Sequence, residues 1–159
     1  MTNITIERVT GPTSELRALI DELNTVLGAA YEPHQRHGLA FDQLFEPHVR
    51  FFVARIDGSG AVGCGGVALF GDYAEVKRMY TRPAVRDRGV AKALLRSIEG
   101  EARAAGRLIL RLETGIHQPE AMGLYRNAGF QPCGPFGAYA AMPPANIELS
   151  RFFEKQLSA

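Results

Sequence analysis

Hydrophobic and polar residues alternate along residues 3–9 (NITIERV), a pattern that predicts a β-strand. Residues 11–31 instead repeat leucine and isoleucine at helical spacing after a possible N-cap at Ser14, and so predict an amphipathic helix. An irregular polar connector follows over residues 32–39, and residues 40–45 (AFDQLF) predict a short helix. The chain is therefore expected to begin with a strand and two helices.

Three strand-like runs fill residues 49–83. Asp57–Gly60 and Gly71–Asp72 separate them, and these residue types are typical of hairpin turns. After them the period changes to that of a helix from Arg86 to about Ala105, with Gly106 where a helix is expected to stop. The remaining pattern predicts a strand over residues 107–114, a helix over 118–130 ended by Gly129, and a last strand over 147–157.

This order of elements indicates an α/β fold. The hairpins make the first strands antiparallel, whereas a strand–helix–strand crossover places residues 76–81 beside residues 108–114 in parallel. No repeat or linker divides the chain, so a single domain over residues 1–159 is expected. In such sheets a ligand sits beyond the carboxyl ends of the strands, where the crossover helix begins.

The composition and charge of the chain bear on which kinds of ligand and partner to expect. The net charge of +1 argues against broad binding to nucleic acid or to a membrane surface, and the apolar runs are too short and glycine-rich to span a bilayer. The start of the sequence lacks a signal-peptide pattern, and two cysteines without metal-ligand spacing favour a reducing cytoplasm. His34 and His37 have no further ligands near them in sequence, so no metal is expected.

One stretch suggests an anionic ligand. Residues 85–95 (VRDRGVAKALL) put Gly89 and the cations Arg86, Arg88 and Lys92 at the start of the predicted helix. Unpaired backbone N–H groups and the helix dipole favour an anion there, and the cations would suit a phosphate. A solvated basic helix start is an equally good interpretation of this stretch alone.

Two motifs in this order resemble signatures of the GNAT acetyltransferase superfamily. Arg86-x-x-Gly89-x-Ala91 is similar to its acyl-CoA signature, and residues 118–130 (QPEAMGLYRNAGF) resemble the second one. Gln118 stands where the second signature usually has Asn, and FGAY at residues 136–139 lacks the Asp that often precedes the Tyr. The C-terminal part also resembles a small stand-alone bacterial branch. The resemblance implies a mixed, mostly antiparallel sheet with a parallel β-α-β core flanked by helices, and acetyl-CoA as co-substrate.

The resemblance also implies roles for individual residues. Tyr125 is expected to protonate the departing thiolate, and the Met79 backbone N–H to stabilise the oxyanion. Glu75 is the expected proton acceptor, with Glu113 or water as alternatives. Strand alternation predicts that the Glu75 and Met79 side chains share one face. The residues expected to bind the cofactor are Met79, Tyr80, Thr81, Arg86, Arg88, Gly89, Val90, Ala91, Lys92 and Gln118.

The favoured function is an N-acetyltransferase that transfers the acetyl group of acetyl-CoA to a primary amine by direct attack in a ternary complex. The amine, on a small molecule, a protein N-terminus or a lysine, is expected to enter beside residues 31–39. A non-catalytic acyl-CoA-binding regulatory module is the alternative, and a Rossmann or P-loop site lacks the required glycines and Gly-Lys-Ser/Thr ending. A homodimer is expected only by analogy of fold.

Overall fold

A seven-stranded sheet organises the computed structural model, which describes residues 3–159. Its strand order is β1-β2-β3-β4-β5-β7-β6, and every neighbouring pair is antiparallel except β4 and β5. The predicted mixed sheet with one parallel β-α-β unit is therefore confirmed. The strands are β1 (Ile4–Val9), β2 (Val49–Ile56), β3 (Ala61–Leu69), β4 (Ala74–Thr81), β5 (Ile109–Gly115), β6 (Gln131–Cys133) and β7 (Ser150–Gln156).

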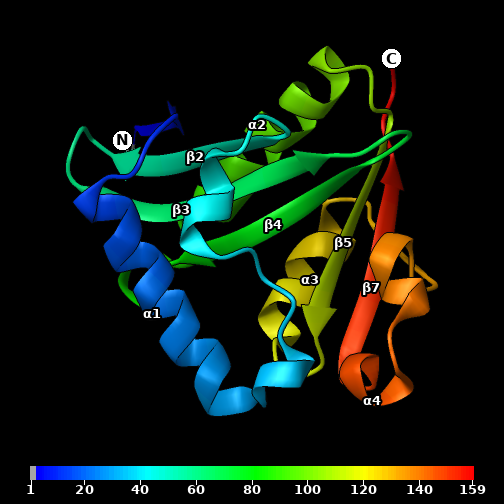
Figure 1. Cartoon of the computed structure of the whole chain (residues 1–159). Coiled ribbons are helices and arrows are strands. Elements are labelled where there is room, and N and C mark those ends of the chain that lie inside the picture. The colour runs from blue at the N-terminus through cyan, green and yellow to red at the C-terminus, as the bar shows by residue number, and fades with distance from the viewer. Residues whose placement is uncertain (1–2) are drawn as a thin grey trace.

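Helices cover both faces of this sheet (Figure 1). They are α1 (Ser14–Ala30), α2 (Val90–Ala104), α3 (Pro119–Asn127) and α4 (Pro144–Ile147). Single 3₁₀ turns occur at Pro33–Gln35, Phe41–Phe45, Pro83–Val85 and Gly137–Ala141.

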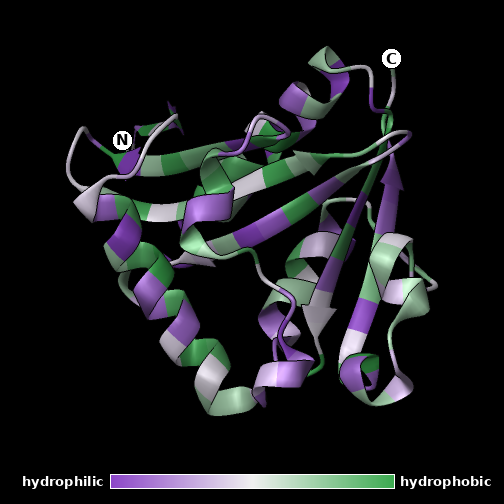
Figure 2. Ribbon diagram, viewed as in Figure 1, coloured by the Kyte–Doolittle hydropathy of each residue, from purple (hydrophilic) through white to green (hydrophobic). Residues whose placement is uncertain are grey.

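Helix α1 packs on one face through a stripe of four buried side chains. Leu16, Leu19, Ile20 and Leu23 contact a core that includes Phe51 on β2. Figure 2 shows hydrophilic residues between the hydrophobic ones along α1, as expected for a helix with one buried face. The N-cap is Thr13, one residue before the possible cap at Ser14, because the Thr13 Oγ1 accepts the Leu16 N–H at 3.1 Å.

Helices α2 and α3 cover the opposite face. Val90, Leu94, Leu95, Ile98 and Ala102 of α2 are buried in a second core that includes Tyr125 of α3. Burying one such aliphatic side chain stabilises the fold by about 1.5–3 kcal/mol. The sheet is therefore packed between two hydrophobic cores, one under α1 and one under α2 and α3.

Among the differences from the sequence prediction are two element boundaries and one additional strand. Helix α2 begins at Val90 rather than Arg86, because Asp87 and Gly89 adopt positive φ angles of 63° and 87°. The last strand begins at Ser150 rather than residue 147, because the preceding residues form α4 with a proline at its first position. Strand β6 has three residues and was not predicted.

A β-bulge in β4 changes which side chains share a face. Gly66 pairs with Lys77 and Cys64 pairs with Tyr80, so β4 holds one residue more than β3 between these pairs. Arg78, inside the bulge, has φ 57°. The alternation is therefore broken: Met79 packs in the α2 core, whereas Glu75 points to the face that α1 covers. The prediction that the Glu75 and Met79 side chains share one face is wrong.

The parallel strands β4 and β5 separate almost at once. Their register contains only Ala74 with Leu110 and Glu75 with Arg111, and beyond these pairs the strands diverge (Figure 1). The β4 edge from Val76 onward therefore has no partner strand on that side. The divergence opens the sheet at the carboxyl end of β4, where a ligand was predicted.

Candidate active site

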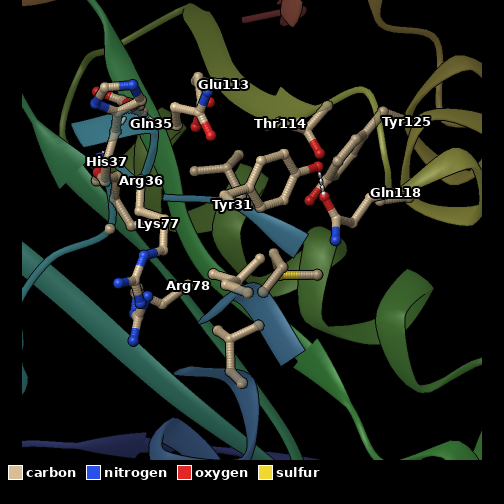
Figure 3. Close-up of a pocket in the computed structure, with 18 residues that line it drawn as sticks. Tyr31, Gln35, Arg36, His37, Lys77, Arg78, Glu113, Thr114, Gln118 and Tyr125 are labelled. Atoms are coloured by element: carbon tan, nitrogen blue, oxygen red, sulfur yellow. Dashed lines mark hydrogen bonds and ion pairs between the residues drawn. The ribbon is translucent and has the colours of Figure 1, made fainter. Parts of the chain in front are cut away.

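The diverging strands frame a pocket of about 140 Å³. Its wall comes from α1, the loop after it, β4, β5 and α3, so segments far apart in the sequence meet here (Figure 3). The polar side chains in this wall are Tyr31, Gln35, Arg36, His37, Glu75, Lys77, Arg78, Glu113, Thr114, Gln118 and Tyr125.

Tyr31 ties the end of α1 to the start of α3. Its hydroxyl donates to the Gln118 Oε1 and accepts the His117 backbone N–H at 2.9 Å. Gly115 allows this approach, because a Cβ there would collide with the Tyr31 ring. Gln118, predicted to contact the cofactor, therefore uses its side-chain oxygen on Tyr31.

A buried ion pair between Glu75 and Lys77 lines the pocket. Glu75 is 4% exposed, and its Oε2 lies 3.1 Å from the Lys77 Nζ and accepts the Tyr139 hydroxyl at 2.6 Å. The Lys77 ammonium also contacts the Tyr139 hydroxyl and the His37 carbonyl, each at 3.2 Å. Because Glu75 is already paired and hydrogen-bonded, its charge is compensated inside the fold.

Glu113 is the second carboxylate of the pocket, and its environment differs. Its Oε2 accepts the Ser150 hydroxyl at 2.7 Å. Burial raises the pKa of Glu113, and the charge of Glu75 adds to this, whereas the Ser150 hydrogen bond and the charges of His37 and Lys77 oppose it. A carboxylate with a raised pKa is a better proton acceptor than an ordinary one.

His37 connects the loop after α1 to the C-terminal part of the chain. Its Nε2 lies 2.7 Å from the Asn146 carbonyl, and its ring meets Tyr139 edge-on with centroids 5.5 Å apart. The loop that lines the pocket is thereby held against α4.

Tyr125 lies on the side of the pocket opposite Arg36 and Arg78 (Figure 3). The residue is 6% exposed, and its ring packs against Phe130 at 5.7 Å. Burial raises the pKa of Tyr125, and the negative charge of Glu113 raises it further. The phenol is therefore protonated throughout the neutral range and can act as a proton donor.

The N-terminus of α2 has no side chain that caps its backbone N–H groups. Gly89 is its N-cap, with φ 87° and no side-chain cap, and Arg86, Arg88 and Lys92 beside it are exposed. Uncapped N–H groups at Val90, Ala91 and Lys92 can bind an anion such as a diphosphate. Arg86 is held near by a 3.7 Å contact with Glu120 and a hydrogen bond to the Thr81 carbonyl at 3.4 Å.

The backbone of β4 leads from this helix end to the pocket. Thr81 and Tyr80 pair with β3 on one side, while their other edge lies in the divergence from β5. The Tyr80 side chain is buried and donates to Glu22 at 3.1 Å, so its main chain alone is available to a ligand. Such an edge can bind an amide-bearing chain such as pantetheine as an added strand.

The structure thus brings the predicted Glu75, Glu113, Met79, Gln118 and Tyr125 together around one pocket. Tyr31, Arg36 and His37 of the predicted acceptor loop also line it, whereas Arg86, Arg88 and Lys92 surround the separate helix end. Sequence reasoning missed Lys77, Arg78, Tyr139 and Ser150 as parts of the site. The alternation in β4 gave a signal for Lys77 alone, since it places Lys77 on the face of Glu75.

Within residues 3–159, no group of three or more His, Cys, Asp or Glu side chains is arranged to hold a metal ion. None of the helices that the structure describes is long and apolar enough to cross a membrane. Cys64 is buried in β3, where burial raises the pKa of its thiol to about 12.

Known proteins match the chain in sequence and in fold. An IAA acetyltransferase of Azospirillum brasilense is 43% identical over 99% of this chain and 100% of its own length. A Klebsiella pneumoniae protein, described as an acyl-CoA N-acyltransferase, is 33% identical, with a TM-score of 0.83 over 98% of each chain. A GNAT family acetyltransferase of Elizabethkingia anophelis with acetyl-CoA bound shares the fold, with a TM-score of 0.68 over 98% and 99% of the two chains, at 18% identity. The model of the acetyltransferase (GNAT) family matches residues 16–130. The chain is therefore a member of the GNAT acetyltransferase family.

Proposed function

We propose that the protein transfers the acetyl group of acetyl-CoA to a primary amine by direct attack in a ternary complex. The observation that carries this proposal is the divergence of β4 and β5 after Glu75, with an uncapped helix N-terminus at one end and Tyr125 at the pocket. Family membership supports the acyl transfer, and the acetyl-CoA bound to the Elizabethkingia protein supports the cofactor.

The residues present fit acetyl-CoA. The N–H groups at the start of α2 bind its diphosphate, with Arg86, Arg88 and Lys92 as cations, and the edge of β4 at Met79 to Thr81 pairs with the pantetheine amides. The acetyl thioester supplies an activated carbonyl group. The backbone N–H of Met79 stabilises the charge on its oxygen, because Met79 lies in the bulge and has no partner in the β3 register.

Two side chains of the pocket move protons. Glu113, with its raised pKa, takes the proton that the attacking amine loses, through an intervening water. The new C–N bond forms as the C–S bond breaks, and Tyr125 donates its proton to the leaving thiolate. Glu75, the acceptor expected from the sequence, instead positions Tyr139 and Lys77, because both groups already bind its Oε2.

An acetylation assay over a panel of amines tests this proposal. CoA release is measured for the wild type and for Tyr125→Phe. IAA, for which a relative is named, is tested as a separate acceptor beside the amines. Loss of general acid help predicts a fall in kcat of roughly 10²–10⁴-fold for Tyr125→Phe, with unchanged affinity for acetyl-CoA. Acetyl-CoA binding without turnover of any amine would favour the regulatory module, and no acetyl-CoA binding would refute both functions.

A further inference from the structure

Two guanidinium groups at the pocket lack a carboxylate partner. Arg36 and Arg78 lie at one side of the pocket, with Gln118 and Tyr125 at the other (Figure 3). Neither arginine takes part in an ion pair within residues 3–159. Lys77, in contrast, has its charge matched by Glu75 at 3.1 Å. The positive charge on this side of the pocket is therefore uncompensated.

Arg78 has an unused hydrogen-bond donor as well. Its Nη2 donates to the Asn24 Oδ1, but its Nε is buried and has no hydrogen-bond partner in the part of the chain that the structure describes. Buried polar atoms without a partner are rare in folded proteins, and each one needs an explanation. Because the protein encloses this Nε, a ligand in the pocket would meet the Nη groups of Arg78, and the unpaired Nε adds to the cost of placing the guanidinium here.

The fold holds Arg78 in this place. Its φ of 57° is a conformation that side-chain-bearing residues adopt only when the surroundings enforce it. Gly38 in the loop after α1 lies so close that a Cβ there would collide with the guanidinium. The bulge in β4 and the loop thus fix the guanidinium from two directions, which is the preorganisation a binding site needs.

The electrostatics favour an anion at the same place. Burial lowers the pKa of Arg78, and the like charge of Arg36 lowers it further. A negative charge on Cys64 would raise this pKa. With that thiol neutral at pH 7, the Arg36 cation is the charge that remains to act on Arg78 among residues 3–159. A carboxylate between the two guanidinium groups removes the repulsion and matches their planar donors.

We propose that Arg36 and Arg78 bind a carboxylate of the acceptor, so that the substrates are small amines of amino-acid type rather than proteins. This inference rests on the proposed acetyltransferase function. A volume of about 140 Å³ suits such a small acceptor, since pockets for drug-sized ligands measure roughly 300–1,000 Å³. The anchored carboxylate leaves the amine of the acceptor free to point toward Tyr125 and the thioester.

The experiment compares amino acids with their carboxamides, and with the matching aminophosphonates, as acceptors. Turnover is followed by CoA release, and binding is measured by calorimetry with and without CoA. The expected result is that carboxylates exceed carboxamides by roughly 10- to 100-fold in kcat/KM or affinity, the range of a charge-assisted hydrogen bond. A higher kcat/KM for aminophosphonates would overturn the carboxylate assignment and indicate an acceptor of phosphate type. Equal kcat/KM and affinity for acids and amides would also overturn the proposal.

Variants locate the effect. Arg36→Gln and Arg78→Gln are each expected to lower kcat/KM for carboxylates more than for carboxamides and so to abolish the preference. Arg96→Gln, at an exposed arginine on α2, is the control and should keep the preference. Because Arg36 is exposed, Arg36→Gln tests the site even if Arg78→Gln fails to fold. A preference that survives Arg36→Gln would refute the assignment. If acetyl-CoA binds and both amine classes react equally, this proposal alone fails; if acetyl-CoA does not bind, the proposed function fails.

Discussion

The buried pair of Glu75 and Lys77 allows a sharp prediction about stability. Their side chains are 5% and 10% exposed, and the Nζ to Oε2 distance is 3.1 Å. Lys77→Met keeps an apolar stem of similar length but removes the ammonium. Glu75 then keeps the Tyr139 hydrogen bond and loses its counter-charge in a place where water does not replace it.

The expected cost is about 3–5 kcal/mol, the range for removing one partner of a buried ion pair. For a chain of this size each kcal/mol lowers Tm by about 2–4 °C, so Tm should fall by roughly 6–20 °C. Urea unfolding, followed by circular dichroism, measures these changes.

Two comparisons control for this prediction. The double variant Glu75→Gln/Lys77→Met removes both charges and should recover much of the lost stability. Lys155→Met removes a cation from Glu99, but Glu99 keeps Arg103 at 3.6 Å, so the cost should be below about 1 kcal/mol. A loss below 1 kcal/mol for Lys77→Met, or no recovery in the double variant, would show that Glu75 is not an ion-paired structural acid.

Three further changes test other parts of the account. Gly89→Ala forces an L side chain into φ 87°, so unfolding should become easier by about 1–2 kcal/mol and the KM for acetyl-CoA should rise in steady-state assays. The Glu113 pKa is raised and the group acts deprotonated, so kcat/KM should rise with pH as Glu113 loses its proton. Glu113→Gln should remove this rise from the pH profile and lower kcat/KM roughly 10²-fold. The Arg55 hydrogen bond, with the Ala61 N–H, lowers the Glu15 pKa from 4.5 to about 2, so its stabilisation is present above pH 4.5 and lost as the pH falls toward 2. Since the Glu15 side chain is 43% exposed, Glu15→Gln should cost less than about 1 kcal/mol at pH 7 in urea titrations.

Much of the fold was predictable because it depends on local signals. The period of the apolar residues distinguishes strands from helices, and Asp57-Gly58 and Gly71-Asp72 mark both hairpin turns. Gly106 and Gly129 end their helices with φ of 76° and 96°, as glycine after a helix commonly does. These signals lie within a few residues of the structure they determine.

The bulge at Arg78 shows where local signals stop. Residues 74–77 alternate, but Lys77 and Arg78 are both polar and Met79 and Tyr80 are both apolar. Because an arginine gives no indication of a positive φ, period-two reasoning was carried through this break and put Glu75 and Met79 on one face. The bulge follows from how β4 must pair with β3 while leaving β5. Pairing between distant segments, rather than local preference, determines it.

The candidate site shows the same division. Motif resemblance was enough to indicate the helix end at Gly89 and the position of Tyr125. The contacts of Glu75 with Tyr139 and of Glu113 with Ser150 join residues separated by 64 and 37 positions. Nothing local in the sequence shows which distant hydroxyl binds which carboxylate, so the distinction between the two acids required the structure.

The central claim is that the backbone at the start of α2 binds the diphosphate of CoA. Amide NMR shifts during separate titrations with CoA and with pantetheine, which lacks the diphosphate, test it most directly. We predict that CoA shifts the signals of Gly89 to Lys92 and of Met79 to Thr81, whereas pantetheine shifts those of Met79 to Thr81 alone. Unchanged signals at Gly89 to Lys92 in saturating CoA would contradict the account.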